Sequence, residues 1–349
     1  MLATNHPVLR RFWYALAPMS KLEAGPWGTT LLGTPLVLWL TPEGKPAALI
    51  DRCCHRTAKL SIGWVDKEAG GIACGYHGWT FDASGKCIRI PQWKDQSREI
   101  SFGVEAFLCE ERYGYVWVCL DKEPVAPIPD IPEASDPSFR QIHEFHEVWH
   151  SPGLRIMENS FDNAHFSYVH RESFGIIEDP EPARLTIDPI DHGFEMRTVV
   201  PVKNPDQQKK NLGIAEEFTV RNYTKTFWLP FSRKMRVDYP NGLVHIIVTC
   251  TAPVDDRSSL VCQFVYRNDT EADAPAAGVI AFDRQVTHED QAVLENCEYD
   301  VPLELASGRE FHMPSDRPGL EMRRMLKALL AAHGETETGP VLEPAAAAE

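Results

Sequence analysis

The sequence predicts an α+β protein with an all-β N-terminal domain and a C-terminal domain of mixed strands and helices. Residues up to about 120 form short apolar runs separated by turn residues, a pattern that is typical of strands. Helical and strand-like patterns both follow beyond residue 138. Between the two parts lie prolines at positions 124, 127, 129, 132 and 137. Because such a run cannot form the interior of a helix or a sheet, it predicts a domain boundary.

The individual elements follow from short stretches of sequence. In the N-terminal part, strands are expected within 29–41, 46–51, 71–91 and 112–121. In the C-terminal part, we expect a helix within 148–175, strands at 243–254 and 258–268, and a largely helical run from Val279 to about Leu330. The predicted organisation is a domain at 1–122, a proline-rich linker at 123–137, a domain at 138–333 and a disordered, low-complexity tail at 334–349.

Composition limits the class of protein. A chain of 349 residues with 43% hydrophobic content is long enough for two domains with cores. No apolar run reaches the length of a membrane span, and the N-terminus lacks the features of a secretory signal. The nine cysteines, an odd number, indicate thiols in a reducing compartment, so a cytoplasmic protein is expected. A net charge of −15 without a basic block argues against nucleic acid as a partner.

Two cysteine–histidine pairs carry the first chemical signal. Cys53 and His55 form a C-x-H motif with Cys54 as the spacer, and Cys74 and His77 form a C-x2-H motif. A structural zinc ion also accepts two cysteines and two histidines, and buried thiols beside hydrogen-bonded histidines need no metal. However, each loop supplies one thiolate and one imidazole. This arrangement favours a [2Fe–2S] centre with two cysteines on one iron and two histidines on the other.

A second group of candidate ligands lies in the stretch ENSFDNAHFSYVH. Asn159, Asp162 and His165 follow one another at steps of three, which places them on one face of a helix. His170 lies about 140° around an ideal helix from His165, so both imidazoles reach one ion only if the helix unwinds or bulges. Two histidines and a carboxylate suit a divalent iron with open positions for O2. Asp162 is expected to accept the ring N–H of His165 that the metal does not use.

The carboxylate ligand is sought by helical periodicity in the stretch FDRQVTHEDQAVLENCE. The apolar stripe of this helix consists of Phe282, Val286, Val293, Leu294 and Cys297. Asp290 falls roughly 30° from the middle of the stripe, and Glu289 roughly 70° from it on the other side. A carboxylate near the centre of an apolar face is costly unless it is paired or binds metal. Asp290 is therefore the predicted ligand, while Glu289 reaches solvent more easily and His288 lies on the surface.

Candidate substrate contacts are less specific. Aromatic residues are frequent around the second group and in the segment TKTFWLPFSRKM, which suits a ring-shaped apolar ligand. Phe166 and Trp228 are the candidates there, although such side chains more often belong to an ordinary core. His245, inside an apolar strand, is either an anchor for a polar substituent or a core histidine. Arg155 and Arg233 either meet a substrate carboxylate or are surface charges.

With both motifs in one chain, residues 7 to 330 resemble the catalytic (alpha) subunit of Rieske non-haem iron oxygenases. The resemblance extends through the stretches HGWTFDASGKCIRIP and ERYGYVWV to the pattern D-x2-H-x4-H at Asp162, His165 and His170, preceded by Asn159. The chain looks most like the branch that includes vanillate and dicamba O-demethylases, aminopyrrolnitrin oxygenase and chlorophyll-catabolic relatives. Cys54 stands where the family more often has proline.

This resemblance implies two metal centres. The cluster ligands would be Cys53, His55, Cys74 and His77. The catalytic domain would have a helix-grip fold, an antiparallel sheet with helices, and its Fe(II) ligands would be His165, His170 and Asp290. The family also forms homotrimers in which the residue matching Asp162 bridges the iron-ligating histidine to the cluster histidine, here His77, of the adjacent subunit.

The resemblance also implies a function and its partners. The chain would be the oxygenase component of a system that uses O2 to hydroxylate or oxidatively dealkylate a small apolar, cyclic or aromatic substrate. Electrons would come from NAD(P)H through a ferredoxin or a flavoprotein reductase, because no G-x-G-x-x-G motif supplies a nicotinamide site. The alternative is a Rieske electron carrier or redox sensor with a non-catalytic C-terminal module. The presence of all candidate iron ligands favours the oxygenase.

Overall fold

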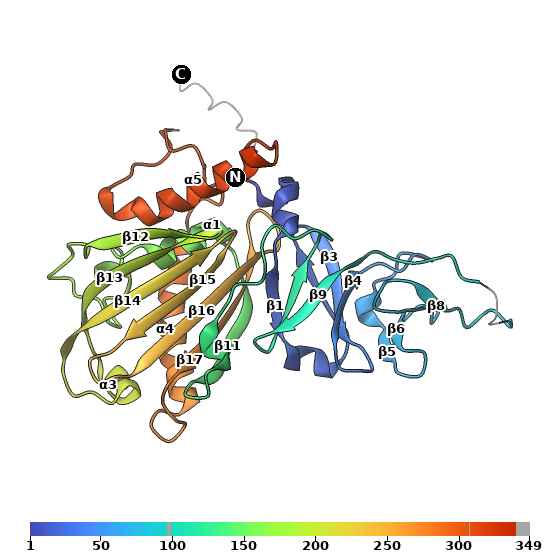
Figure 1. Ribbon diagram of the computed structural model, residues 1–349, viewed down its shortest axis with the longest axis horizontal. Helices are drawn as coiled ribbons and strands as arrows, with labels where there is room; N and C mark the ends of the chain where they lie inside the picture. Colours follow the sequence, from blue (N-terminus) through green and yellow to red (C-terminus); the bar gives the residue numbers. More distant parts are fainter. Residues whose placement is uncertain (96–98, 307, 340–349) are drawn as a thin grey trace. The chain divides into compact units, whose positions relative to one another are not determined.

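The computed structural model describes residues 1–95, 99–306 and 308–339, and the predicted tail beyond residue 339 lies outside the described residues. The chain divides into two compact units (Figure 1). One unit spans residues 10–128, and the other combines residues 1–9 with the chain from Pro129 onward. The division falls within the proline-rich segment at 123–137.

The smaller unit contains two antiparallel sheets, which confirms the prediction of an all-β N-terminal domain. The six-stranded sheet has the order β1-β10-β9-β4-β3-β2 and consists of β1 (Tyr14–Pro18), β2 (Trp27–Leu31), β3 (Thr34–Leu40), β4 (Pro46–Ile50), β9 (Ala106–Arg112) and β10 (Tyr115–Cys119). The four-stranded sheet has the order β5-β6-β7-β8 and consists of β5 (Trp64–Asp66), β6 (Gly71–Ala73), β7 (Thr80–Phe81) and β8 (Cys87–Arg89). Two 3₁₀ helices of this unit are η3 (Met19–Ala24) and η4 (Leu60–Ile62).

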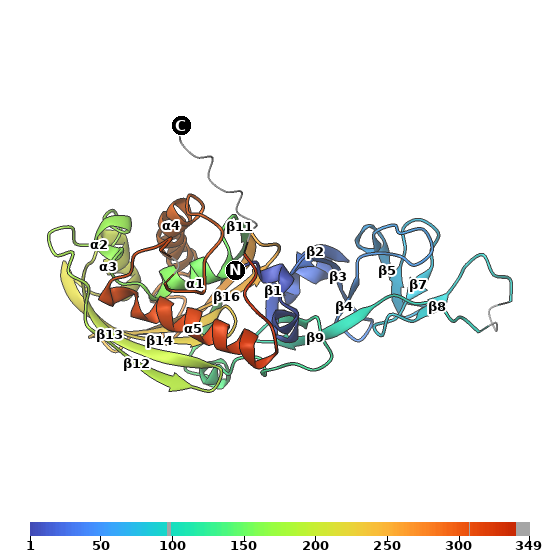
Figure 2. The ribbon, with the colours of Figure 1, turned by 90° about the horizontal axis from the view of Figure 1, so that it is seen from above.

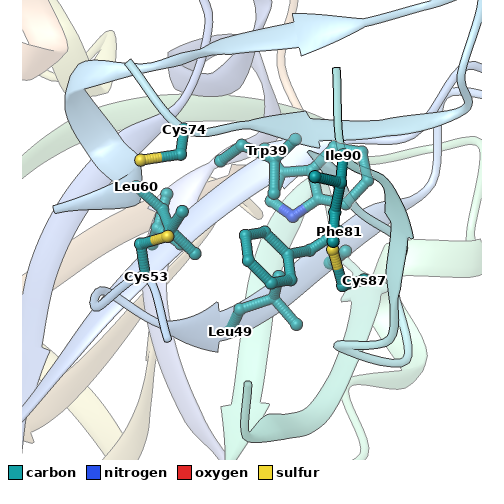
Figure 3. Packing of buried hydrophobic residues seen from close by; sticks show 11 residues of the cluster. Trp39, Leu49, Cys53, Leu60, Cys74, Phe81, Cys87 and Ile90 are labelled. Atoms are coloured by element: carbon teal, nitrogen blue, oxygen red, sulfur yellow. The ribbon is translucent and has the colours of Figure 1, made fainter. Parts of the chain in front are cut away.

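A buried apolar cluster joins the two sheets of the smaller unit (Figure 3). Strands β3 and β4 contribute to it from one sheet, and β6, β7 and β8 from the other. Cys53 and Cys74 belong to the same cluster and lie on one side of it, next to Leu60. Because apolar burial is the main force that holds such segments in place, this core anchors both cysteines.

The larger unit is built on a seven-stranded antiparallel sheet of order β11-β17-β16-β15-β14-β13-β12, and Figure 2 shows α1, α2 and α4 on one side of it. Its strands are β11 (Arg140–Trp149), β12 (Leu185–Ile190), β13 (Gly193–Lys203), β14 (Phe218–Trp228), β15 (Ser232–Asp238), β16 (Val244–Pro253) and β17 (Ser259–Arg267). Its helices are α1 (Gly153–Phe161), α2 (Phe166–Val169), α3 (Asp206–Leu212), α4 (Ala276–Leu294) and α5 (Arg317–Ala332). Strands β16 and β17 occupy the two stretches that were predicted, and the α+β class is confirmed.

The helical run predicted from Val279 to about Leu330 is interrupted. Helix α4 ends at Leu294 and α5 begins at Arg317. The described residues between them contain one 3₁₀ turn, η6 (Pro314–Asp316). Pro302 and Pro314 lie in this connection, and a proline removes a backbone donor and clashes with the preceding helical turn. No helix of the described residues combines the length and the apolar character that a bilayer crossing requires.

Residues 334–339, the first part of the predicted tail, make defined contacts with the N-terminal segment. The N–H of Val8 donates to Glu335 (2.8 Å), and the N–H of Leu2 donates to the carbonyl of Thr338 (2.7 Å). The prediction of disorder is therefore wrong for these six residues. Their polar composition gives no sign of partners that lie more than 300 positions away in the sequence.

Arg323 ties α5 to α1 through buried ion pairs. Its guanidinium, 3% exposed, donates to Glu158 on α1, to Glu310 and to the carbonyl of Pro302. Replacing one partner of a buried pair leaves an uncompensated charge, so Arg323→Met is expected to lower the free energy of unfolding by about 3–5 kcal/mol. Urea unfolding followed by circular dichroism measures this loss.

Arg324 offers the matched control on the same helix. Its side chain is 58% exposed and pairs only with Glu321, one turn away (3.1 Å) among the described residues. Exposed pairs of this kind contribute little, so Arg324→Met is expected to change the free energy of unfolding by less than about 1 kcal/mol. Equal losses in the two variants would contradict the special role of the buried pairs of Arg323.

Candidate metal centres

Cys53 and Cys74 begin two loops with the same backbone hydrogen bonds. In each loop the cysteine N–H donates to the carbonyl five residues later, at 2.8 Å. The cysteine carbonyl accepts the N–H of the residue four positions later, Thr57 (3.0 Å) in the first loop and Gly78 (2.9 Å) in the second. The two residues that donate to the cysteine carbonyls, Thr57 and Gly78, have positive φ, 58° and 71°, which is a rare conformation for a β-branched threonine. The backbone of each loop thus closes on its own cysteine and holds a histidine inside the turn.

The thiols of the two loops are buried, and the imidazoles are partly exposed. His55 stacks on Trp79 with ring centroids 4.5 Å apart, and His77 lies edge-on to His55 at the same centroid distance. Burial is the largest of the effects that raise the pKa of Cys53 to about 12. His55 Nδ1 is buried and has no hydrogen-bond partner among the described residues, as expected of a nitrogen that serves as a metal ligand. Cys54 is exposed.

The spread of the four donors fits a cluster better than a single ion. A tetrahedral zinc ion would draw all four donor atoms together, but in the described chain no three donors of Cys53, His55, Cys74 and His77 lie within 4.8 Å of one another. A [2Fe–2S] cluster requires two separate pairs instead. The residues therefore fit the cluster, with two thiols on the core side and two imidazoles toward solvent.

We expect the cluster to depend on Cys53 and to tolerate substitution of Cys54. Cys53→Ser should abolish the visible absorbance of the cluster, because a buried thiolate ligand is lost. Cys54→Pro should retain it, because the Cys54 side chain is exposed and the turn is closed by other residues. Absorbance and acid-labile sulfide measure both outcomes. A colourless Cys54→Pro protein beside a coloured Cys53→Ser protein would show that the ligand register is displaced by one residue.

The second group of candidate ligands lies where a helix breaks. Helix α1 ends immediately before Asp162, whose backbone is extended (φ −74°, ψ 138°), and α2 begins immediately after His165 and ends before His170. The Asp162 carboxylate accepts the N–H of Ala164 (2.7 Å), a local bond that competes with helix formation. The prediction that Asn159, Asp162 and His165 share one helix is therefore wrong. The break supplies the unwinding that the five-residue spacing of the histidines requires.

Three donor atoms converge beside this break. His165 Nε2 and His170 Nε2 lie 3.2 Å apart, and Asp290 Oδ1, from α4, lies 3.4 Å from the first and 3.3 Å from the second. Donors bonded about 2.1 Å from an ion at 90–110° are separated by about 3.0–3.4 Å. Asp290 Oδ1 is also buried without a hydrogen-bond partner in the described part of the chain. The donor set therefore fits a divalent ion such as Fe(II).

A carboxylate holds the outer nitrogen of each imidazole. Asp162 Oδ2 lies 3.1 Å from His165 Nδ1, and Glu289 Oε2 lies 2.8 Å from His170 Nδ1. Burial alone would raise the pKa of both carboxyls, but the adjacent imidazoles outweigh it and lower the pKa of each. The ionised carboxylates accept hydrogen bonds from the two Nδ1–H groups. Both Nε2 lone pairs are therefore directed toward the same point.

Orientation, not exposure, separates Asp290 from Glu289. The two side chains are almost equally exposed, 17% and 16%, so the expectation that Glu289 reaches solvent more easily is wrong. Ser173 also donates a hydrogen bond to Glu289 (2.8 Å) and holds it on the outer side of His170. His288 is exposed, as predicted.

A cavity of about 90 Å³ adjoins the three donors. It lies between α1, α2 and α4 on one side and strands β14 to β17 on the other, and Asn159, Phe166 and His245 are among its lining residues. Trp228 is not. Alternate residues of β14 face the cavity, from Arg221 through Lys225, and the even-numbered Trp228 belongs to the opposite set.

The structure separates the two candidate arginines. Arg155 lies away from this cavity and pairs with Glu310 (2.8 Å) and Glu158 (3.6 Å). Arg233 is 8% exposed and lines the cavity. Sequence reasoning missed two further buried cations of the lining, Arg221 and Lys225. Their alternate spacing with Tyr223 in a strand-like stretch is the signal that could have identified them.

Comparisons with known proteins agree with this geometry. Residues 12–107 match the Rieske [2Fe-2S] domain, and residues 149–332 match the vanillate O-demethylase oxygenase C-terminal domain. The chain is 30% identical to methylxanthine N3-demethylase NdmB of Pseudomonas putida over 341 residues, which cover 94% of this chain and 91% of that protein. It is 36% identical to the dicamba O-demethylase oxygenase component of Stenotrophomonas maltophilia over 166 residues, 47% of this chain and 48% of that protein. Among solved structures, Pseudomonas putida NdmA with caffeine has a TM-score of 0.80 at 26% identity, with 94% of this chain and 93% of that chain covered.

A Rieske domain joined to a two-histidine, one-carboxylate site beside a cavity defines an iron-dependent oxidoreductase. The chain belongs to the Rieske non-haem iron oxygenases and is an oxygenase component. Its cofactors are a [2Fe–2S] cluster and a mononuclear iron, and O2 is its co-substrate. Relatives are named as oxygenase components or subunits of multicomponent systems, which implies a separate protein as the electron donor.

Proposed function

We propose which residues hold the two cofactors. Cys53, His55, Cys74 and His77 hold the cluster, and His165, His170 and Asp290 hold the iron. The observation that carries the second assignment is the convergence of three donors from two distant segments, with Asp290 Oδ1 buried and otherwise without a partner in the described residues. Bound there, the iron supplies the O2 chemistry of the family, and the cavity beside it holds the substrate.

The chain's own residues prepare this site. Asp162 and Glu289 fix the tautomer of each histidine, so that both Nε2 atoms are free of protons and available to the metal. Asn159 lines the cavity and contacts Asp290. Burial raises the pKa of that carboxyl, but His170, His165 and, to a smaller extent, a hydrogen bond with Asn159 lower it. Asn159 is thus a positioning residue for the carboxylate ligand.

The substrate is proposed to be a small cyclic or aromatic molecule that is hydroxylated or oxidatively dealkylated. Phe166, Phe174 and Phe282 supply aromatic walls to the cavity. Its volume of about 90 Å³ is of the same order as an engineered cavity of about 150 Å³ that binds benzene, which favours a single ring. Relatives are named as N- and O-demethylases, which supports dealkylation as the reaction to test first.

We propose further that the protein works in the cytoplasm as a homotrimer with a ferredoxin or flavoprotein reductase. Ile62, Trp64 and Tyr76, beside the second cluster loop, are exposed by 70%, 51% and 65%. Exposed apolar side chains gathered at one place are typical of interaction surfaces. Asp162 is 30% exposed on its own unit, which leaves it accessible to His77 of a neighbouring subunit. The cysteines of the described chain are free thiols, which suits a reducing compartment.

Metal analysis and O2 uptake test the proposal together. Purified protein is expected to contain about three irons per chain, two in the cluster and one mononuclear. With NADH and a surrogate reductase, methoxyarenes and N-methyl heterocycles should stimulate O2 uptake, and formaldehyde release would identify demethylation. About two irons per chain and no substrate-dependent uptake would instead indicate an electron carrier, and zinc without visible absorbance would contradict the cluster.

A further inference from the structure

Three cationic side chains line the cavity of a chain whose net charge is −15. Arg221 and Lys225 come from β14 and Arg233 from β15, and each is at least nine-tenths buried. Among the described residues of the lining, two are acidic: Asp283 and the candidate iron ligand Asp290. The lining thus holds three basic side chains and two acidic ones, and burial lowers the pKa of Lys225 to about 7.

Two of the three cations already have partners. Lys225 Nζ donates to the carbonyl of Ser160 (3.0 Å) and to the side chain of Asn163 (3.3 Å). Arg221 lies over the ring of Phe174, 5.2 Å from its centroid, and contacts a second ring and two polar side chains. Both side chains thus have partners within the protein, although Arg221 Nε is buried without a hydrogen-bond partner among the described residues.

Arg233 differs from them. Its Nε and Nη1 atoms are buried and have no hydrogen-bond partner among the described residues, and no carboxylate of the described chain lies within 4.0 Å of the guanidinium. Burial lowers the pKa of Arg233 to about 10, so the side chain remains charged near neutral pH. Asp290 and Glu144 act on this charge and raise its pKa against burial, but neither forms an ion pair with it. A buried charge with unpaired donors is costly, so the guanidinium can accept an anionic partner in direct contact.

The nearest acidic groups are committed elsewhere. Glu144 accepts a hydrogen bond from Gln263 on one oxygen (2.7 Å), and its Oε1 is buried without a partner among the described residues. Burial, together with Asp283, raises the pKa of this carboxyl well above its usual value. Asp283 lies 3.3 Å from His245 Nε2. Asp290 faces the two histidines of the triad. Neither acid on the cavity wall forms an ion pair with Arg233 among the described residues, although the charge of Asp290 raises its pKa.

We propose that Arg233 binds a carboxylate group of the substrate, so that the enzyme acts on aromatic or cyclic carboxylic acids and not on neutral rings. The planar guanidinium fork matches a carboxylate with two parallel hydrogen bonds, and the aromatic walls take the ring. This inference rests on the proposed function, because it assigns the substrate class of the same cavity.

Isothermal titration calorimetry on the cluster-loaded protein tests this inference with 4-methoxybenzoate and its neutral counterpart 4-methoxybenzamide. Wild-type protein is expected to bind the acid at least about 10-fold more tightly than the amide. Arg233→Met should weaken binding of the acid about 10- to 100-fold and change binding of the amide less than about threefold. Arg233→Lys, which keeps the charge without the fork, should lie between the two.

Arg236 supplies the matched control. It lies on β15 three residues away, in the alternate set of side chains, and pairs with Asp238 (2.8 Å). Arg236→Met should leave both affinities within about threefold of wild type. Cluster absorbance and circular dichroism check that each variant is folded, and the acid–amide comparison in wild-type protein does not depend on any variant.

Three results would overturn the inference: equal binding of acid and amide by wild-type protein, no binding of either at millimolar concentration, or unchanged acid binding in a folded Arg233→Met protein. Binding heats do not require turnover. Tight, Arg233-dependent binding of the acid without O2 uptake would therefore count against the proposed oxygenase reaction and leave the role of Arg233 standing.

Discussion

Replacing His170 or Asp290 with alanine is expected to remove the mononuclear iron and abolish turnover while the cluster absorbance stays intact. Each residue supplies one of three donor atoms that lie 3.2–3.4 Å apart, and two protein ligands hold a divalent ion far more weakly than three. Loss of a supporting hydrogen bond alone typically lowers metal affinity about 10- to 100-fold, so loss of a ligand should exceed this. The two centres belong to separate compact units, and iron content, visible absorbance and O2 uptake report on them independently.

Two neighbours on α4 provide controls for this experiment. His288 is exposed and contacts only Arg284 (2.9 Å) among the described residues, so His288→Ala should keep iron and activity. Glu289→Ala removes the acceptor of His170 Nδ1 and should weaken iron binding about 10- to 100-fold without abolishing it at high iron concentration. If Glu289→Ala lost iron entirely and Asp290→Ala retained it, the ligand assignment would be reversed.

Asp162→Asn is expected to slow substrate-dependent oxidation of the reduced cluster about 10- to 100-fold, with both metals and the trimer retained. One oxygen of Asp162 accepts the N–H of Ala164 (2.7 Å), which an asparagine oxygen can also do, and the other faces His165 Nδ1 at 3.1 Å. In the proposed trimer the carboxylate also accepts a hydrogen bond from His77 of the adjacent subunit. Asparagine keeps the size of the side chain but loses the charge that holds both imidazoles.

Stopped-flow absorbance of the reduced cluster, mixed with O2 and substrate, measures this rate. Asp179→Asn, a change of the same kind at an exposed position after α2, should leave the rate unchanged. In a monomeric form with both metals bound, oxidation of the reduced cluster should also be slow, because the iron would then have no cluster of a neighbouring subunit to receive electrons from. An unchanged rate in a metal-replete Asp162→Asn protein would make Asp162 a structural residue.

The sequence predicts those features of the fold and the site that depend on residues close together in the chain. The two cysteine loops are closed by hydrogen bonds four and five residues long, so their motif is complete within the sequence that forms it. Helical periodicity likewise predicts that Asp290 lies toward the buried face of α4, because the burial of one helix face is a local pattern, but it does not predict that Glu289 is almost equally buried. The β16 and β17 strands are found for the same reason.

Features that depend on packing between distant segments are not predictable in this way. The side chain of Glu289 looks solvent-directed on a helical wheel, yet it contacts His170 because α2 packs against α4. Arg233 has two equally good interpretations in the sequence, and only the neighbours across the sheet show that it is buried without a partner. The break between α1 and α2 depends on a hydrogen bond of Asp162 that competes with the helix.

The closed backbone turns around Cys53 and Cys74 also affect how the reduction potential of the cluster can change between related enzymes. Each turn is closed by backbone hydrogen bonds of the cysteine itself, so the side chains next to the ligands contribute little to the stability of the turn. Positions such as Cys54, Arg56 and Tyr76 are exposed and lie beside the sulfur and imidazole ligands. Cluster potentials respond to nearby charge, hydrogen bonds and solvent access. Substitutions of exposed side chains, in evolution or by design, can therefore change the reduction potential of the cluster to suit different electron donors while the backbone turns stay the same.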